Sequence, residues 1–526
     1  MRGPRFIWYI NGDESHRNTQ ISRFIAEYFH DDNSGNESFP LSNRSEDILT
    51  EILKMIPCSF TIVRETNHID RAYSEGYYIH YSSKHICQTR FCERLSVFYG
   101  RVLATDFIDE TRHAKLQKGY VGSVVIHPTS EGKVGRTLID PGKINLGHPD
   151  MCIRVSEYET DIRGVRLTLQ AFPYRMQDVE LTTCAEVTLL NLLEYYGHRY
   201  DEYRNTYTEE LMRVLQRNSV ERIIPAHGLS YSLMTKTLSE VGFAPRLYSG
   251  SIYNNLQSIL FSYVESGIPV GVGLFEHRSE TGFKSLGHSM VCIGHGEMNT
   301  RPEMNIEIRR GARDFVYFNA ADYYDSFVMM DDNCPPYMLK ALKNYGGNSE
   351  INILVPLYKR MFLEASDAFS IAENIIVQSE VSIDRMSEVG YRDVGTEDRP
   401  LVLRLFLASS KTYKDSKMKL PRKDYEYLKA ILFDLPLPRF VWICECYEKS
   451  EYEKKDCKMA CGEILIDATA SSFAPQDSVI LIHYPGHIAY RYPDQEWSEV
   501  FPFLHSMIIP EWKPFPGMNR NLHRYV

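Results

Sequence analysis

The chain contains no apolar run that approaches the roughly 18 residues needed to cross a bilayer. Near its start, Phe6–Ile10 is apolar. That run is shorter than the apolar core of a secretory signal, which spans about 7–15 residues. We therefore expect a cytoplasmic protein that does not contact membranes.

The sequence also has no long run of lysine and arginine, and its net charge is −10, from 59 basic and 69 acidic residues. Nucleic-acid binding requires a basic face that neutralises phosphates, so we expect no nucleic-acid partner. No glycine-rich phosphate-binding loop follows a strand pattern, which argues against a nucleotide cofactor. The eleven cysteines are an odd number and are scattered. A chain of this size folds without disulfides, so we interpret most of them as reduced core residues.

The length of 526 residues favours about three or four domains at roughly 150 residues each. We divide the chain into an N-terminal mixed α/β domain (1–150), a central domain (151–360) and a C-terminal mixed α/β domain (361–526). In the first domain the patterns predict helices over 21–29 and 46–56 and strands over 60–63, 76–81 and 122–126. The glycine- and proline-rich stretch 128–150 is interpreted as the exit from this domain.

The central domain has helices first and strands afterwards, an order typical of α+β folds. The predicted helices are 184–196, 207–216, 230–241 and 253–266. The predicted strands are 269–274, 288–294, 314–319 and 326–330. A predicted hairpin, over 153–158 and 165–169, precedes these helices and strands. In the C-terminal domain we expect a helix over 363–377 and strands over 401–407, 440–446, 462–466 and 479–483.

Cys184 stands at the predicted start of a helix. Thr183 and Glu186 form the S/T-x-x-E pattern of a capping box, which makes Cys184 the first helical residue. Leu189, Leu192, Leu193 and Tyr196 then repeat at helical spacing. A helix start presents unpaired N–H groups and a partial positive charge, and both favour a thiolate over a thiol. Cys184 is therefore a candidate nucleophile.

A nucleophilic cysteine needs a base, a residue that orients the base, and a group that stabilises the oxyanion. His288 opens a short apolar strand and is the candidate base. Asp331 follows the strand 326–330, and a carboxylate there would orient the imidazole. Asp332 is adjacent and is kept as an alternative to Asp331. Gln177, seven residues before Cys184, is the candidate oxyanion donor.

In this order, Gln177-Asp178, Thr183-Cys184-Ala185, Gly287-His288 and Asp331 resemble the papain-like cysteine peptidases, and most of all their bacterial C39-like branch. The resemblance covers about 166–356 and leaves both flanks aside. It implies a papain-like core with a helical half and an antiparallel sheet. It implies that Cys184 is the nucleophile, His288 the base, Asp331 the orienting residue and Gln177 the oxyanion donor. It further implies a thiol protease that cleaves a peptide or isopeptide bond in a peptide or protein substrate, with no metal and no organic cofactor.

Two other functions use the same residues. An amine in place of water would make the protein an acyltransferase of the transglutaminase type, and an inert thiol would make it a papain-like module that only binds peptides. A zinc site at Cys444, Cys446, Cys457 and Cys461 is disfavoured. Structural zinc sites use pairs separated by two to four residues, and the first pair here is C-x-C.

Overall fold

The computed structural model describes residues 6–29, 43–85, 88–129, 133–148, 150–276, 287–299, 306–342, 349–378, 394–419, 426–454, 459–471, 475–484, 487–500, 509–510 and 521–525. Helices and strands take nearly equal shares, 34% and 33%, and almost all strand pairs are antiparallel. The α+β class is therefore confirmed. None of the described helices is both long and apolar enough to cross a membrane.

The N-terminal part is built on one antiparallel sheet whose five strands are neighbours in chain order. These are β1 (Ile7–Ile10), β2 (Phe60–His68), β3 (Cys92–Tyr99), β4 (Tyr120–His127) and β5 (Lys133–Ile139). Its helices are α1 (Glu14–Phe29), α2 (Asn43–Lys54), α3 (Arg71–Ile79) and α4 (His113–Gly119). The apolar faces of α1 and α2 pack on one face of the sheet. The hairpin of β7 (Ser156–Ile162) and β8 (Val165–Ala171) packs on the other, together with α4.

Two predictions for this part are wrong. The stretch 76–81, with its three tyrosines, was expected to be a strand, but most of it belongs to α3. Asp70 caps this helix by accepting the N–H of Tyr73, and Gly76 lets it approach Leu181. This tertiary contact outweighs the strand preference of the tyrosines. The stretch 128–150 is not a plain exit, because it contains β5.

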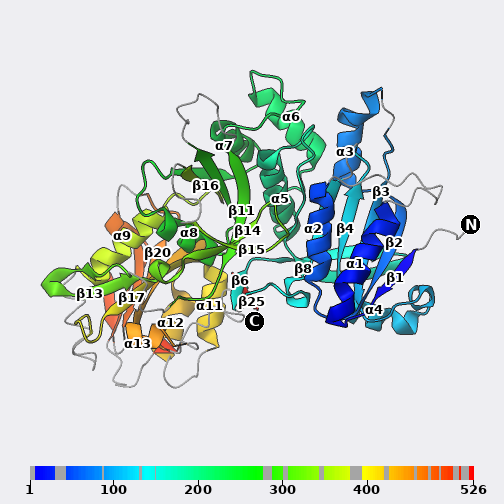
Figure 1. Ribbon diagram of the computed structural model, residues 1–526. Coiled ribbons are helices and arrows are strands. Elements are labelled where there is room, and N and C mark those ends of the chain that lie inside the picture. The colour runs from blue at the N-terminus through cyan, green and yellow to red at the C-terminus, as the bar shows by residue number, and fades with distance from the viewer. Residues whose placement is uncertain are drawn as a thin grey trace, which may run out of the picture.

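The central sheet has the strand order β15-β14-β11-β10-β16-β9, and β6 pairs with β11. Its strands are β6 (Met151–Ile153), β9 (Ala244–Ser249), β10 (Val270–Glu276), β11 (His288–His295), β14 (Ser326–Met330), β15 (Met338–Ala341) and β16 (Ser349–Leu357). The helices of this part are α5 (Cys184–Arg199), α6 (Thr208–Asn218), α7 (Tyr231–Glu240) and α8 (Leu256–Glu265). Residues 185–196 of α5 are all buried, so α5 is the core helix on which Cys184 is mounted (Figure 1).

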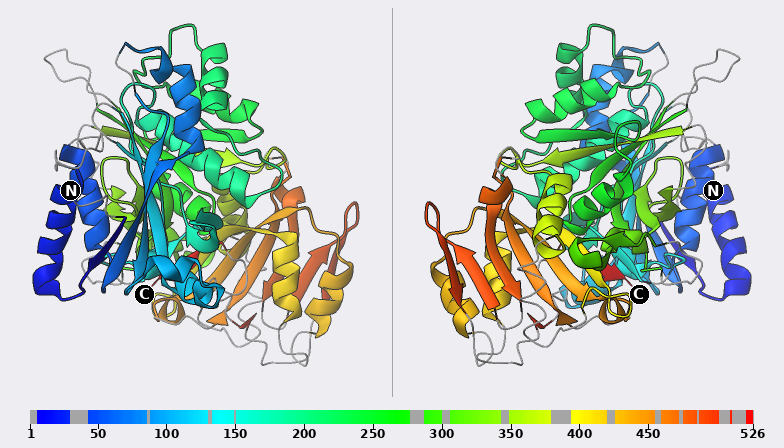
Figure 2. Two further views of the ribbon diagram at one scale, coloured as in Figure 1. Left: turned by 90° about the vertical axis from the view of Figure 1, so that its right-hand side faces the viewer. Right: turned by 90° about the vertical axis from the view of Figure 1, so that its left-hand side faces the viewer.

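The C-terminal sheet has the order β12-β13-β17-β18-β20-β21-β22-β23. Its strands are β12 (Arg309–Arg310), β13 (Val316–Asn319), β17 (Leu401–Ser409), β18 (Phe440–Glu448), β20 (Gly462–Asp467), β21 (Val479–Tyr484), β22 (His487–Arg491) and β23 (Trp497–Val500). A separate two-stranded pair is formed by β19 (Met459–Ala460) and β24 (Ile509–Pro510). The helices are α9 (Ala365–Ile376), α11 (Ser410–Met418), α12 (Glu426–Asp434) and α13 (Lys449–Tyr452). Figure 2 shows the yellow helices α11 and α12 lying against the orange strands, with which they share an apolar cluster.

The central and C-terminal parts exchange strands. β13 comes from the central stretch of the chain, yet it pairs in parallel with β17 of the C-terminal sheet. In return, β25 (His523–Tyr525), at the end of the chain, pairs with β6 and so extends the central sheet. One apolar cluster contains residues of α8, β10, β11, β17 and β18. The two parts therefore share one core.

Candidate active site

Cys184 is the first residue of α5, as the sequence predicts. Thr183 precedes the helix and donates its backbone N–H to Glu186 Oε2 at 2.9 Å, as in a capping box. Before it, the Asp178 carboxylate accepts the backbone N–H groups of residues 180, 181 and 182. These bonds fix the loop that leads into α5. The half-buried thiol lies 3.9 Å from the carbonyl oxygen of Gly287.

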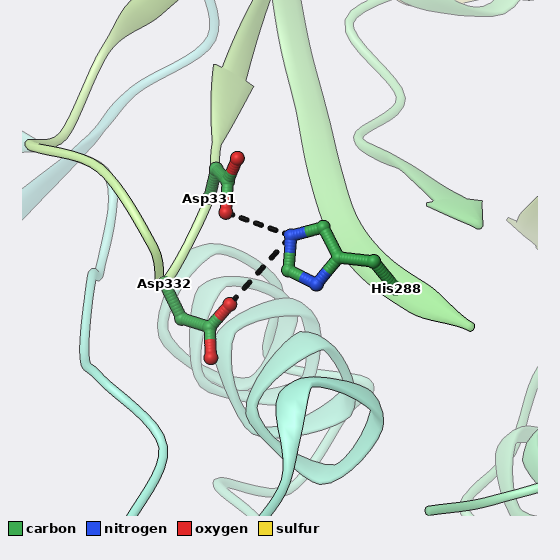
Figure 3. A group of neighbouring side chains, drawn as sticks. All are labelled: His288, Asp331 and Asp332. Atoms are coloured by element: carbon green, nitrogen blue, oxygen red, sulfur yellow. Dashed lines mark hydrogen bonds and ion pairs between the residues drawn. The ribbon is translucent and has the colours of Figure 1, made fainter. Parts of the chain in front are cut away.

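His288 begins β11, directly after Gly287. Its Nε2 lies 2.8 Å from Asp331 Oδ1 and 3.8 Å from Asp332 Oδ1. Figure 3 shows both carboxylates pointing at this one ring nitrogen. The Cys184 side chain is close enough to the imidazole to contribute to raising the pKa of His288. The structure thus brings together Cys184, His288 and Asp331, in the order that the prediction gives them.

The electrostatics favour a charged imidazole. Burial alone would lower the pKa of His288. The hydrogen bond to Asp331, the nearby Cys184 side chain and the charges of Asp331 and Asp332 outweigh burial and raise this pKa to about 10. His288 is therefore protonated at neutral pH. An imidazolium beside a thiol stabilises the thiolate, which is the reactive form of cysteine.

Asp331 is a fully engaged carboxylate. Besides His288, its Oδ1 accepts the backbone N–H of Asn333 at 2.9 Å, and its Oδ2 forms an ion pair with Lys340 of β15. Burial by itself raises the pKa of Asp331, but hydrogen bonds and charge from His288 and Lys340 hold this pKa well below its usual range. Asp331 therefore stays ionised and can hold the imidazolium in place.

Asp332 differs from Asp331 in its surroundings. Its side chain is 1% exposed. Burial, partly offset by the charge of His288, raises its pKa to about 6. Neither of its oxygens meets the geometry of a hydrogen bond with any described residue, although the backbone N–H of Gln177 is close enough to lower the pKa. Of the two carboxylates, Asp331 is the one that hydrogen-bonds the ring.

Gln177 is half-buried and reaches the site through its backbone, which faces Asp332. No hydrogen bond between its side chain and another described residue is present, so nothing in that part of the chain ties it to Cys184. The role of Gln177 as oxyanion donor stays a prediction.

Sequence reasoning missed three side chains at this site. Lys340 balances Asp331, and the Asn333 amide lies 3.1 Å from His288 Nε2. Tyr231, at the start of α7, has a hydroxyl whose pKa is raised by burial first and also by the charge of Cys184, which places it near the thiol. Asn333 was detectable as a polar residue just after a strand. Lys340 and Tyr231 carry no local signal, because β15 and α7 reach the site only through tertiary pairing.

His288, Asp331 and Asp332 have ligand atoms within 4.8 Å of one another, the one such group of metal-ligand residues among the described parts of the chain. One member of this group, Asp331, is already paired with the positive charge of Lys340. Within the described ranges, Cys444, Cys446 and Cys461 are not part of such a group. These three cysteines are buried, and Cys457 lies outside the described residues.

Comparison with known proteins adds no relative. A scan of the sequence against protein-family models finds no match, and a search of curated proteins finds none either.

Proposed function

We propose that this protein is a papain-like cysteine hydrolase that cleaves an amide bond in a peptide or protein. The observation that carries the proposal is the chain of contacts from Asp331 through His288 to Cys184, with the thiol at a helix start. A base held by a carboxylate beside a thiol is the arrangement that activates cysteine for acyl transfer. The resemblance of residues 166–356 to C39-like peptidases supports the same chemistry.

The reaction would run in two steps. The Cys184 thiolate attacks the carbonyl carbon, and the resulting oxyanion takes hydrogen bonds from the Cys184 N–H and the Gln177 side chain. The C–N bond then breaks as His288 gives its proton to the leaving amine, which leaves a thioester on Cys184. In the second step His288 takes a proton from water, and the hydroxide attacks the thioester, which releases the acid and restores the Cys184 thiolate beside protonated His288.

The test combines peptide cleavage with acceptor competition. A library of proteome-derived peptides is incubated with the native protein, with Cys184→Ala and with His288→Ala, and new termini are identified by mass spectrometry. We expect cleavage by the native protein that both variants lose by at least about a thousandfold. Cleavage that persists in Cys184→Ala would refute the proposal. No cleavage, together with tight peptide binding, would favour the peptide-binding module.

Two additions separate the remaining alternatives. If a labelled primary amine appears on the acyl fragment in preference to water, the enzyme is an acyltransferase that uses the same three residues. If a chelator abolishes cleavage and Zn²⁺ restores it, the group His288, Asp331 and Asp332 holds a metal, and the thiol mechanism fails. If Zn²⁺ inhibits instead, it competes with the proton on His288, as the thiol mechanism predicts.

A further inference from the structure

A cavity lies away from Cys184, where the N-terminal sheet meets the central part. Its volume is about 420 Å³. One wall is the face of the sheet that carries Arg94 and Arg136, and the others come from the starts of α3 and α6 and from Glu194 on α5. Glu194 follows Cys184 by ten residues of one helix, which is about 15 Å. Figure 1 shows α3 beside α6 above this junction. The cavity is therefore separate from the thiol site.

Arginines make the positive wall. Arg136 donates from Nε to Glu194 Oε1 at 2.6 Å, while neither of its terminal nitrogens has a hydrogen-bond partner among the described residues. The guanidinium of Arg71 lies 4.1 Å above the Tyr207 ring and is largely exposed. Arg71 Nε is paired with Glu75 Oε1 at 3.1 Å, and Arg94 is paired with Glu65 at 2.7 Å. Arg71 and Arg136 thus retain N–H groups that can receive a carboxylate.

Asp70 makes the negative wall. It is 5% exposed, and its Oδ1 accepts the N–H of Tyr73 at 2.9 Å and lies 3.7 Å from His127 Nε2. Burial opposes ionisation of Asp70, but His127 and the Tyr73 N–H hold its pKa well below the usual range. Its Oδ2 takes no hydrogen bond from any residue that the structure describes. Asp70 therefore presents a stabilised negative charge to the cavity.

His68 lines the same cavity and is uncharged at neutral pH. Burial, followed by the positive charge of Arg94, lowers its pKa to about 4. No hydrogen bond of its ring is present within the described ranges. A neutral imidazole can donate or accept, so it suits a polar ligand of either sign.

The two walls together select the ligand. A simple anion would face the charges of Asp70 and Glu194, and a simple cation would face Arg71 and Arg136. The volume falls in the range of about 300–1,000 Å³ that small-molecule sites occupy, well above that of an ion. We propose that this cavity binds a small zwitterion, an α-amino acid or a dipeptide, with its carboxylate on Arg136 and Arg71 and its ammonium on Asp70.

Calorimetric titration of the full chain tests this with the standard L-amino acids and with the dipeptide Ala-Ala. We expect at least one of them to bind with a Kd below about 1 mM. The N-acetyl and amide derivatives of that ligand each lack one charge and should bind at least about tenfold more weakly. Arg136→Gln and Asp70→Asn should weaken binding by a similar factor. The asparagine keeps the oxygen that caps α3.

Cys184→Ala is the matched control and should bind the ligand as the native protein does. If Arg136→Gln does not fold, as judged by circular dichroism, the exposed Arg71→Gln replaces it with the same expectation. The proposal is overturned if none of these molecules binds at up to about 10 mM. It is also overturned if the singly charged derivatives bind equally well, or if binding is lost in Cys184→Ala and kept in the arginine variants, because the ligand would then occupy the thiol site.

Discussion

The change that probes the site most directly is Asp331→Asn. The pKa of His288 is raised from 6.5 to about 10, which corresponds to on the order of 5 kcal/mol in favour of the imidazolium. The hydrogen bond to Asp331 is the largest contribution that raises this pKa. If it supplies roughly half, the variant loses about 2 kcal/mol of support for the thiolate–imidazolium pair, and the reactive population falls by at least about tenfold.

The assay is alkylation by limiting iodoacetamide between about pH 5 and 9, with each cysteine followed by mass spectrometry. Because the pKa of His288 is raised, its interactions stabilise the folded protein. This stabilisation is complete below about pH 6.5 and is lost as the pH rises through about 10. Native Cys184 should therefore react well below the pH at which ordinary thiols do. In Asp331→Asn its rate at about pH 6 should fall at least tenfold. Exposed Cys58 is the internal reference, and its rate should not change.

Asp332→Asn is the matched control, because it removes the neighbouring carboxylate but leaves the 2.8 Å bond between His288 and Asp331. Its effect on Cys184 alkylation should stay within about threefold. A larger loss in Asp332→Asn than in Asp331→Asn would assign the orienting role to Asp332. An Asp331→Asn rate within about twofold of the native one would refute the electrostatic reasoning for this site.

Asp332→Asn and two further substitutions test stability. Because burial raises the pKa of Asp332 to about 6 from 3.8, its charge destabilises the fold above that pH. Asp332→Asn should then raise the free energy of unfolding by up to about 3 kcal/mol at pH 8 and by almost nothing at pH 4, and an equal gain in urea unfolding at both pH values would contradict this. Glu265→Gln should lower the free energy of unfolding by about 3 kcal/mol, because Glu265 is buried against His295 and Arg404. A loss below about 1 kcal/mol would show that these ionic contacts of Glu265 contribute little. Glu186→Ala should cost about 1 kcal/mol and speed amide exchange in the first turn of α5, and unchanged exchange would show that the capping box does not hold that turn.

Local patterns located the parts of the site that depend on local structure. The start of α5 follows from Thr183, Glu186 and the spacing of its leucines, and the structure begins the helix at Cys184. The start of β11 at His288 follows from an apolar run after a glycine. Both features are determined by neighbours in the chain, so the sequence expresses them directly.

The features that the sequence did not reveal depend on distant contacts. Lys340 acts on Asp331 because β15 folds back along β14, with Lys340 opposite Phe327. The helix α3 was mistaken for a strand because its tyrosines favour strands, while the packing of Gly76 against Leu181 decides the conformation. The arginines of the cavity come from α3 and from two separate strands of the N-terminal sheet, β3 and β5. The alternation of side chains along a strand predicts the face of the sheet on which each side chain lies. It does not predict which charged residues of different strands become neighbours.

The C-terminal part is bonded to the central part at several points, and this decides how its role has to be tested. Arg404 of β17 is bonded to Glu265 of α8, which also binds His295 at the end of the strand that begins with His288. Asn521 donates to the carbonyl oxygen of Glu265, just before β25 extends the central sheet. Truncation after residue 360 would remove Arg404 from Glu265 and would take one of two strand partners from each of β13 and β6. A buried charge without its partner costs several kcal/mol. Loss of activity on truncation would therefore report unfolding. Point changes such as Glu265→Gln, read against Cys184 alkylation in protein that remains folded, distinguish support of the strand that begins with His288 from a separate function of this part.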